Sequence, residues 1–158
     1  MSLTGSAILA YFHYASIFLT FAFGFGEAVL YRPTMDAGYL ERLKRIDVLY
    51  LFGAMAIVIT GLLRLFFGGK GTAFYIHNPV FWLKMAMFAA VALLSIVPTV
   101  HYLKFPKTGD VSIARAEHRR VRTFILLQLI IFICIPIAAT FMARGIGLSP
   151  ELPNAFNF

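Results

Sequence analysis

The sequence has little charge and almost no cysteine. Only 13% of its 158 residues are Asp, Glu, Lys or Arg, whereas 60% are hydrophobic, and the mean hydropathy is +0.81. Such a chain cannot cover a water-exposed surface, which excludes an ordinary soluble domain. The single cysteine, Cys134, excludes an internal disulfide and a cysteine-based zinc site, and its apolar neighbours predict a packing role. The chain is therefore predicted to lie in lipid.

The N-terminus lacks the pattern of a cleaved signal peptide. Residues 1–13 carry no basic region, and no small-residue cleavage site closes a short apolar core. We therefore expect the first apolar segment to be retained.

Long hydrophobic runs, in contrast, are abundant. Four segments meet the length of about 20 residues that a helix needs to cross a bilayer, namely 6–31, 46–67, 79–103 and 121–143. They are too long and too evenly apolar for the strands of a barrel. We predict an all-α fold, a four-transmembrane-helix bundle that forms a single membrane domain over residues 1–158. The segment "GGKGTAFYIHNPVFW" is expected to fold back on the bundle mouth, and "SIARAEHRRVR" to begin the fourth helix.

Positive charge is concentrated in the first and third connections. These hold Arg32, Arg42, Lys44 and Arg45, and Lys104, Lys107, Arg115, Arg119, Arg120 and Arg122. Loops rich in Lys and Arg usually face the cytoplasm, so both termini are predicted on the outer (periplasmic) side, which keeps only Arg64, Lys70, Lys84 and Arg144. The net charge of +7 then reflects topology and not nucleic-acid binding. The expected partners are the lipid bilayer and anionic lipids at the basic surface.

Polar residues within the spans follow helical faces. Ionisable groups at membrane depth are costly, usually face the bundle interior and suggest function. Helical spacing places His13 and Glu27 on one face of the first span. The stripe of the first span also contains Thr20, Gly24 and Tyr31. The stripe of the second span contains Asp47, Tyr50, Ala54, Ile57, Gly61 and Arg64. The stripe of the third span contains Lys84, Phe88, Val91, Ser95, Pro98 and Tyr102.

The alternating direction of the helices sorts these residues into two levels, about 20 Å apart at about 1.5 Å per residue. An outer group contains His13, Arg64 and Lys84, which Arg144 can join. An inner polar cluster contains Glu27, Asp47 and His101, with Arg32, Glu117 and His118 nearby. The sequence therefore predicts two sites, or one site and one structural lock.

Structural explanations compete with functional ones at each position. Glu27 and Asp47 can pair with Arg32, Arg45 or His101 at the membrane boundary. Arg64 and Lys84 can extend to the outer headgroups. His13 is either a hydrogen-bonded structural histidine or a metal or haem ligand.

Several segments resemble a family of small bacterial four-helix membrane proteins of unknown function. They are "AYFHY", "GEAVLYRP", "RIDVLYLFG", "TGLLRLFFGGKGTAFYIHNPVFWLK", "SIVPT" and "EHRRVR", and the likeness covers residues 8 to 145. The resemblance implies a multi-pass protein of the bacterial plasma (inner) membrane.

A second resemblance suggests chemistry. His13, "TGLL" and "FWLK" occupy places similar to those in the small four-helix membrane protoporphyrinogen oxidases, which bind haem b. The likeness covers the first three spans, and "GEAVLYRPTMD" departs from that family's pattern. It implies haem b as cofactor. Because a porphyrin needs an axial donor and cations for its propionates, His13 is the candidate ligand of the haem iron, Arg64, Lys84 or Arg144 would meet the propionates, and His77 is a second candidate ligand.

Three functions are therefore open. The first is a haem-b protein in redox or electron transfer, an oxidoreductase-like enzyme if haem is bound. The second is a small-solute or proton pathway, against which apolar packing between Thr20, Ile57 and Val91 would argue. The third is an accessory or assembly subunit that meets another membrane protein or forms a homo-oligomer.

Overall fold

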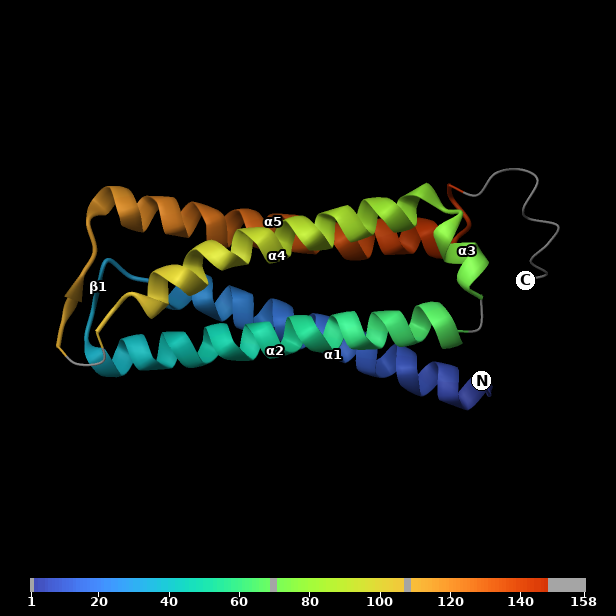
Figure 1. Cartoon of the computed structure of the whole chain (residues 1–158), viewed down its shortest axis with the longest axis horizontal. Coiled ribbons are helices and arrows are strands. Elements are labelled where there is room, and N and C mark those ends of the chain that lie inside the picture. Colours follow the sequence, from blue (N-terminus) through green and yellow to red (C-terminus); the bar gives the residue numbers. More distant parts are fainter. Residues whose placement is uncertain (1, 69–70, 107–108, 148–158) are drawn as a thin grey trace.

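The computed structural model describes residues 2–68, 71–106 and 109–147 (Figure 1). Lys70 and Lys107 lie outside the described residues. The elements are α1 (Leu3–Leu30), β1 (Thr34–Met35), α2 (Ala37–Phe67), α3 (Thr72–Ile76), α4 (Pro79–Leu103), β2 (Val111–Ser112) and α5 (Arg115–Ala143). Within these ranges, the four helices α1, α2, α4 and α5 are long and apolar enough to cross a membrane, as predicted.

Helix α2 begins earlier than predicted, at Ala37 and not near residue 46. The Asp36 side chain caps it by accepting a hydrogen bond of 2.7 Å from the Tyr39 N–H. Arg42, Lys44 and Arg45 therefore belong to a helix and not to a loop. Similarly, α5 begins at Arg115, as the pattern of "SIARAEHRRVR" indicated, and α1 begins at Leu3 after the cap Ser2. The bounds of α4 agree with the prediction.

A short antiparallel ladder, which the sequence did not predict, joins the first and third long connections. Thr34 pairs with Ser112 and Met35 with Val111, and the Ile113 N–H donates to the Pro33 carbonyl at 2.8 Å. We call this end of the bundle the strand end and the opposite end, where the short helix lies, the α3 end (Figure 1).

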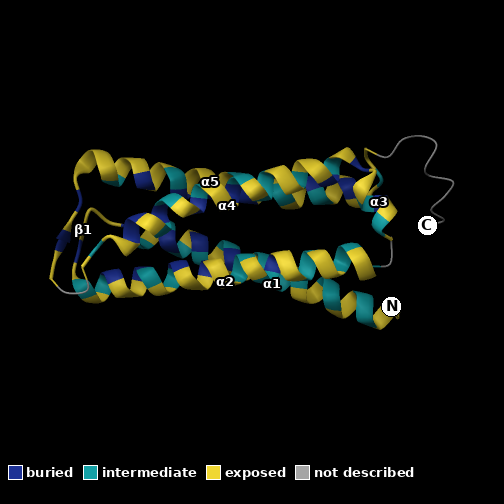
Figure 2. Cartoon of the chain, in the orientation of Figure 1, coloured by how far each residue is buried: buried dark blue, intermediate teal, exposed yellow. Residues whose placement is uncertain are grey.

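The bundle consists of two helical hairpins. Helix α1 packs along α2 and α4 packs along α5, whereas α2 and α4 touch over a short stretch. Helices α1 and α2 approach each other closely at Gly53. The approach requires glycine, because a Cβ atom at this position would overlap the Thr20 hydroxyl. Exposed residues line the outward faces of the long helices (Figure 2). Cys134 is among them, so the predicted packing role is wrong.

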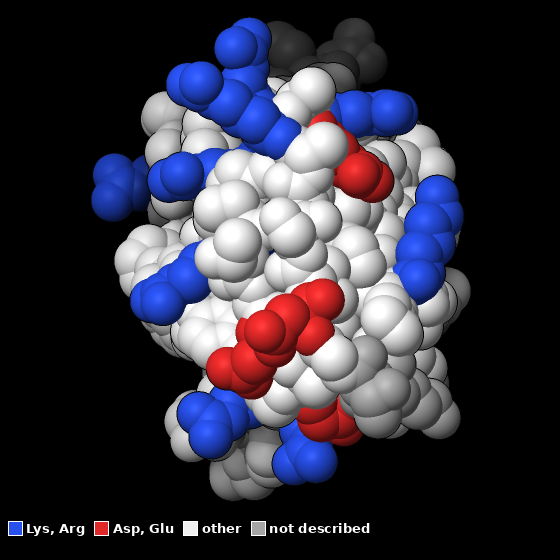
Figure 3. All heavy atoms as spheres, turned by 90° about the vertical axis from the view of Figure 1, so that its left-hand side faces the viewer, with Lys and Arg blue, Asp and Glu red and all other residues white. Residues whose placement is uncertain are grey.

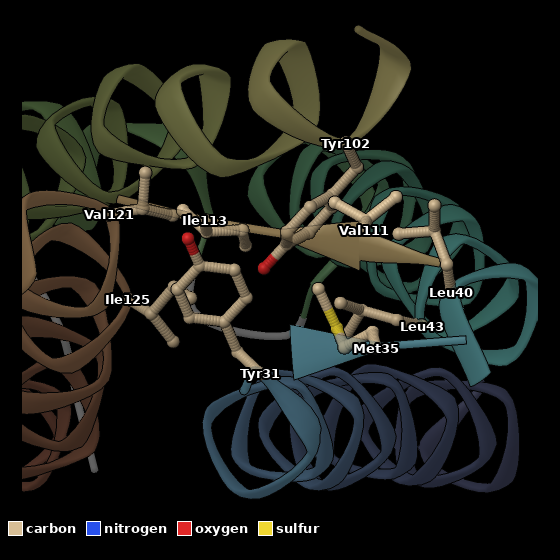
Figure 4. Packing of buried hydrophobic residues seen from close by; sticks show 9 residues of the cluster. All are labelled: Tyr31, Met35, Leu40, Leu43, Tyr102, Val111, Ile113, Val121 and Ile125. Carbon is tan, nitrogen blue, oxygen red and sulfur yellow. The ribbon is translucent and has the colours of Figure 1, made fainter. Parts of the chain in front are cut away.

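Three apolar clusters follow one another along the bundle. The strand-end cluster includes Tyr31, Leu43, Tyr102 and Ile125 and is completed by the residues of the ladder (Figure 4). The other members drawn there are Met35, Leu40, Val111, Ile113 and Val121. The middle cluster consists of Ile57, Val91 and Phe132, with Phe21 packed against it. At the α3 end, Phe74 packs with Phe81 and Met142, so the second connection folds back on the bundle mouth, as predicted.

Charge at the strand end agrees with the sequence. Lys and Arg side chains surround this face, with Asp and Glu between them (Figure 3). That this end faces the cytoplasm stays a prediction.

Candidate functional site

His13 lies in the contact between α1 and α2. Its Nδ1 is 2.8 Å from the Thr60 hydroxyl, and a Cβ atom at Gly61 would lie 3.3 Å from the ring. The Thr60 hydroxyl already donates to the Ala56 carbonyl at 2.6 Å, so it accepts from His13. The ring therefore carries its proton on Nδ1, which leaves Nε2 as the acceptor or ligand atom.

The predicted outer group does gather at this level. Arg64 and Lys84 are close enough for their charges to act on the His13 ring. The Arg64 guanidinium lies over the Tyr14 ring, 5.1 Å from its centroid, and Lys84 Nζ is 3.9 Å from the Met142 sulfur. His13 is thus hydrogen-bonded and accompanied by two cations.

His77 is not brought to this group. Its exposed ring bonds through Nδ1 to the Ala73 carbonyl at 2.9 Å, at the end of α3. A cavity of about 230 Å³ lies between α2 and α4, and neither His13 nor His77, Arg64 or Lys84 lines it. His13 thus offers one ligand atom with two cations beside it, and a haem site built from all four residues stays a prediction.

The inner polar cluster centres on two buried carboxyl groups. Glu27 is 0% exposed and Asp47 5% exposed, and their charges act on each other. Neither Glu27 oxygen has a hydrogen-bond partner of standard geometry among the described residues, although the Tyr102 hydroxyl interacts with it. Asp47 accepts a hydrogen bond of 2.8 Å from the Thr99 hydroxyl. Both carboxyl groups also act on Tyr50, one turn after Asp47 on α2.

The structure does not bear out the structural alternative, in which these carboxyl groups pair with nearby cations. Arg32 lies over the Tyr39 ring, 5.2 Å from its centroid, and Arg45 pairs with Glu41 at 3.3 Å. The ion pairs found across residues 2–68, 71–106 and 109–147 do not include Glu27 or Asp47. An ionised carboxylate buried without a cation is costly, so such a group either holds a proton or binds a cation.

His101 forms a separate chain of contacts. Its Nδ1 is 3.2 Å from Glu117 and its Nε2 is 2.9 Å from the Tyr31 hydroxyl. A neutral His101 ring that carries its proton on Nδ1 satisfies both contacts, because Nδ1 then donates to Glu117 and Nε2 accepts from the Tyr31 hydroxyl. The Glu117 side chain is 54% exposed, and the Tyr31 ring lies 5.8 Å from the Tyr102 ring.

This chain leads from the surface toward Glu27. Figure 4 shows the hydroxyl groups of Tyr31 and Tyr102 directed into the same interior region. His118 stacks on Tyr31 with ring centroids 4.8 Å apart. The three predicted members of the inner cluster therefore form two adjoining groups: Glu27 with Asp47, and His101 with Tyr31 and Glu117.

The middle cluster separates the two levels. Ile57, Val91 and Phe132 are buried together, Phe21 stacks on Phe132, and the Thr20 hydroxyl is turned back to the Ser16 carbonyl at 2.7 Å. This is the apolar packing that argues against a continuous pathway between the outer and inner groups.

Sequence reasoning missed two residues of the inner region. Thr99 holds Asp47, and Gln128 of α5 is buried with neither amide atom partnered within the described part of the chain. The sequence did contain a signal for Thr99 and Gln128, because each is a hydrogen-bonding side chain at membrane depth. The sequence could not show which of them contacts a carboxyl group.

Comparison with known proteins identifies the family. Residues 5–147 match the family model described as "Predicted membrane protein (DUF2214)", and the chain belongs to this family. It is an integral membrane protein of four spanning helices. No curated protein and no solved structure matches, so the likeness to porphyrinogen oxidases gains no support.

Proposed function

We propose that this member of the membrane family binds a small solute in exchange for a proton, with Glu27 as the proton-binding group. One observation carries the proposal: a carboxyl group at 0% exposure in a spanning helix, with neither a cation nor a well-formed hydrogen bond to it in the described chain. Ionisable residues in that position usually serve ion or proton pathways. Asp47 would share the site, since the two charges act on each other.

The contacts of His101 supply a route for the proton. Glu117 is exposed, His101 contacts it at 3.2 Å, and Tyr31 contacts the other ring nitrogen at 2.9 Å. In the proposed exchange, a proton from Glu27 passes through Tyr102 and Tyr31 to His101 and then to Glu117. The apolar middle cluster closes the opposite direction, so the exchange serves the strand end in this conformation.

Infrared difference spectroscopy on the purified protein tests the proton site. We expect a pH-dependent carboxylic acid band that is absent from Glu27→Gln. Glu41→Gln is the matched control, because Glu41 is an exposed acid in an ion pair with Arg45 and its change should leave the band intact. Identical difference spectra for the wild type and Glu27→Gln would refute the proposal.

The proposed route is tested by the rate of the same signal. After a pH jump, Glu117→Gln and His101→Phe should slow the response of the Glu27 band by about 100-fold, the lower end of what a positioned proton-transfer group contributes. The size of the band should not change. An unaltered rate in both variants would remove His101 from the route while leaving the Glu27 site in place.

Haem binding at the α3 end is a second candidate, supported by the grouping of His13 with Arg64 and Lys84. His13 Nε2 would ligate the iron, the two cations would meet the propionates, and the bound haem would supply one-electron chemistry. Protein purified from cells that make haem should then show a Soret band that His13→Ala abolishes and His77→Ala retains. Absence of the band in the wild type would exclude this candidate.

A further inference from the structure

The cavity between α2 and α4 shares two residues, Tyr50 and Thr99, with the surroundings of the two buried carboxyl groups. Its apolar walls include Leu51, Ala54, Phe88 and Ala92, and its floor is formed by Val91 and Phe132. Its volume of about 230 Å³ is below the range of about 300 to 1,000 Å³ that is typical of pockets for drug-sized ligands. An occupant of this space has one ring or one short chain.

The mouth of this cavity faces the surface that lipid would cover. Leu51, Ile96 and Val100 line it and are also 38%, 53% and 43% exposed. Because α2 and α4 touch over a short stretch only, the cavity reaches this outer surface between the two hairpins. A ligand that enters here comes from the hydrocarbon layer and is therefore at least partly apolar.

Three polar residues, Tyr50, Ser95 and Thr99, line the mostly apolar cavity, and two of them link it to carboxyl groups that lie behind its wall. Thr99 donates to Asp47, and Tyr50 senses the charges of both Asp47 and Glu27. Because no described cation pairs with either carboxyl group, the complementary ligand carries positive charge. The aromatic rings of Phe88 and Phe132 offer further favourable contacts to a cation.

We propose that the cavity binds an amphipathic organic cation, an amine whose ammonium group reaches the Glu27 and Asp47 carboxyl groups while its apolar part lies between α2 and α4. This inference rests on the proposed function, because binding of the cation displaces the proton of Glu27. An anionic amphiphile would be repelled by the acids. A metal ion would not need the apolar walls, and no group of three or more His, Cys, Asp or Glu side chains converges in the described chain.

Calorimetry with octylammonium tests the proposal on the full chain in lipid nanodiscs, with empty nanodiscs as blank. We expect saturable one-to-one binding with proton release, detected as a dependence of the heat on the buffer. Octanol and octanoate, which have the same chain length, should bind at least about 10-fold more weakly, or about 1.4 kcal/mol. Glu27→Gln should weaken the binding of octylammonium by a similar factor. Equal binding of the three probes, or no saturable binding, overturns the proposal.

A variant that fills the cavity separates this inference from the proposed function. Ala92→Phe should abolish octylammonium binding and keep the pH-dependent band of Glu27. Ala89→Phe is the matched control, since Ala89 is exposed on the same helix and does not line the cavity. Should Ala92→Phe fail to fold, Ala54→Val serves the same purpose. Binding that survives the filled cavity overturns the inference, and loss of the band in the wild type overturns the proposed function instead.

Discussion

The Thr99 hydroxyl donates a hydrogen bond of 2.8 Å to Asp47, and this contact joins α4 to α2 beside the cavity. The two helices otherwise touch little, so this bond is a specific polar link between α2 and α4, beside the packing of α1 on α5 and the ladder that also join the two hairpins. The bond also fixes the position of Asp47 Oδ1, which accepts it.

Thr99→Val is expected to destabilise the protein by about 0.6 to 1.7 kcal/mol, which are the average and the largest values measured for hydrogen bonds between membrane helices. The lost donor leaves Asp47 buried without its partner, which adds a desolvation penalty. Thr99→Ser keeps the hydroxyl and should cost less. Reversible unfolding in mixed micelles measures both variants, and equal stability of Thr99→Val and the wild type would contradict the expectation.

Gly53→Ala is expected to cost about 1 to 3 kcal/mol, as overpacking does in a well-packed interior. The added methyl group would overlap the Thr20 hydroxyl, so α1 and α2 must separate. At Gly26 the nearest atom to an added Cβ is 3.9 Å away, in Ile46, so Gly26→Ala is a control with ordinary contact. Combining Gly53→Ala with Thr20→Ala should recover part of the loss, and a strictly additive pair of losses would contradict this mechanism.

Tyr31→Phe should destabilise the strand end by about 1 to 3 kcal/mol, because it leaves the buried His101 Nε2 without its donor. Tyr39→Phe is the matched control: the Tyr39 hydroxyl is buried and has no partner in the part of the chain that the structure describes. Removing it should be neutral or stabilising. Unfolding midpoints of the two variants decide the matter, and equal losses would show that the Tyr31 contact contributes nothing.

The predicted orientation can be tested by labelling with a membrane-impermeant maleimide. Cys134 is first replaced by Ser, and single cysteines are placed at two exposed positions, Thr4→Cys at the α3 end and Ser112→Cys at the strand end. The excess of Lys and Arg predicts that Thr4→Cys reacts in intact cells and that Ser112→Cys reacts only after lysis. The reverse pattern would place both termini in the cytoplasm.

Helical periodicity predicted part of the buried face of the helices. Thr20, Gly24 and Glu27 of α1 follow the predicted stripe and are all buried, as are Asp47 and Tyr50 of α2. Because helix direction alternates, the sequence also predicted the meeting of His13 with Arg64 and Lys84. These relationships depend on spacing along a helix, which the sequence contains directly.

Partner choice within a level was not predictable. His101 and Tyr102 are neighbours about 100° apart around α4, and this rotation directs one to Glu117 and the other to Glu27. Spacing placed Tyr102 on the stripe of the third span and His101 in the inner polar cluster, but it did not show which acid each residue contacts. The ladder was missed because strands of two residues, Thr34–Met35 and Val111–Ser112, are too short to produce an alternating pattern.

The ladder constrains the order in which the protein is assembled. Its first strand is synthesised between α1 and α2, but its partner follows α4, so the ladder can form only once the connection after α4 lies beside the connection after α1. The Ile113 amide, which donates to the Pro33 carbonyl, is thus protected from hydrogen exchange only in the assembled bundle. Its exchange rate provides a local measure of hairpin docking that is independent of helix content.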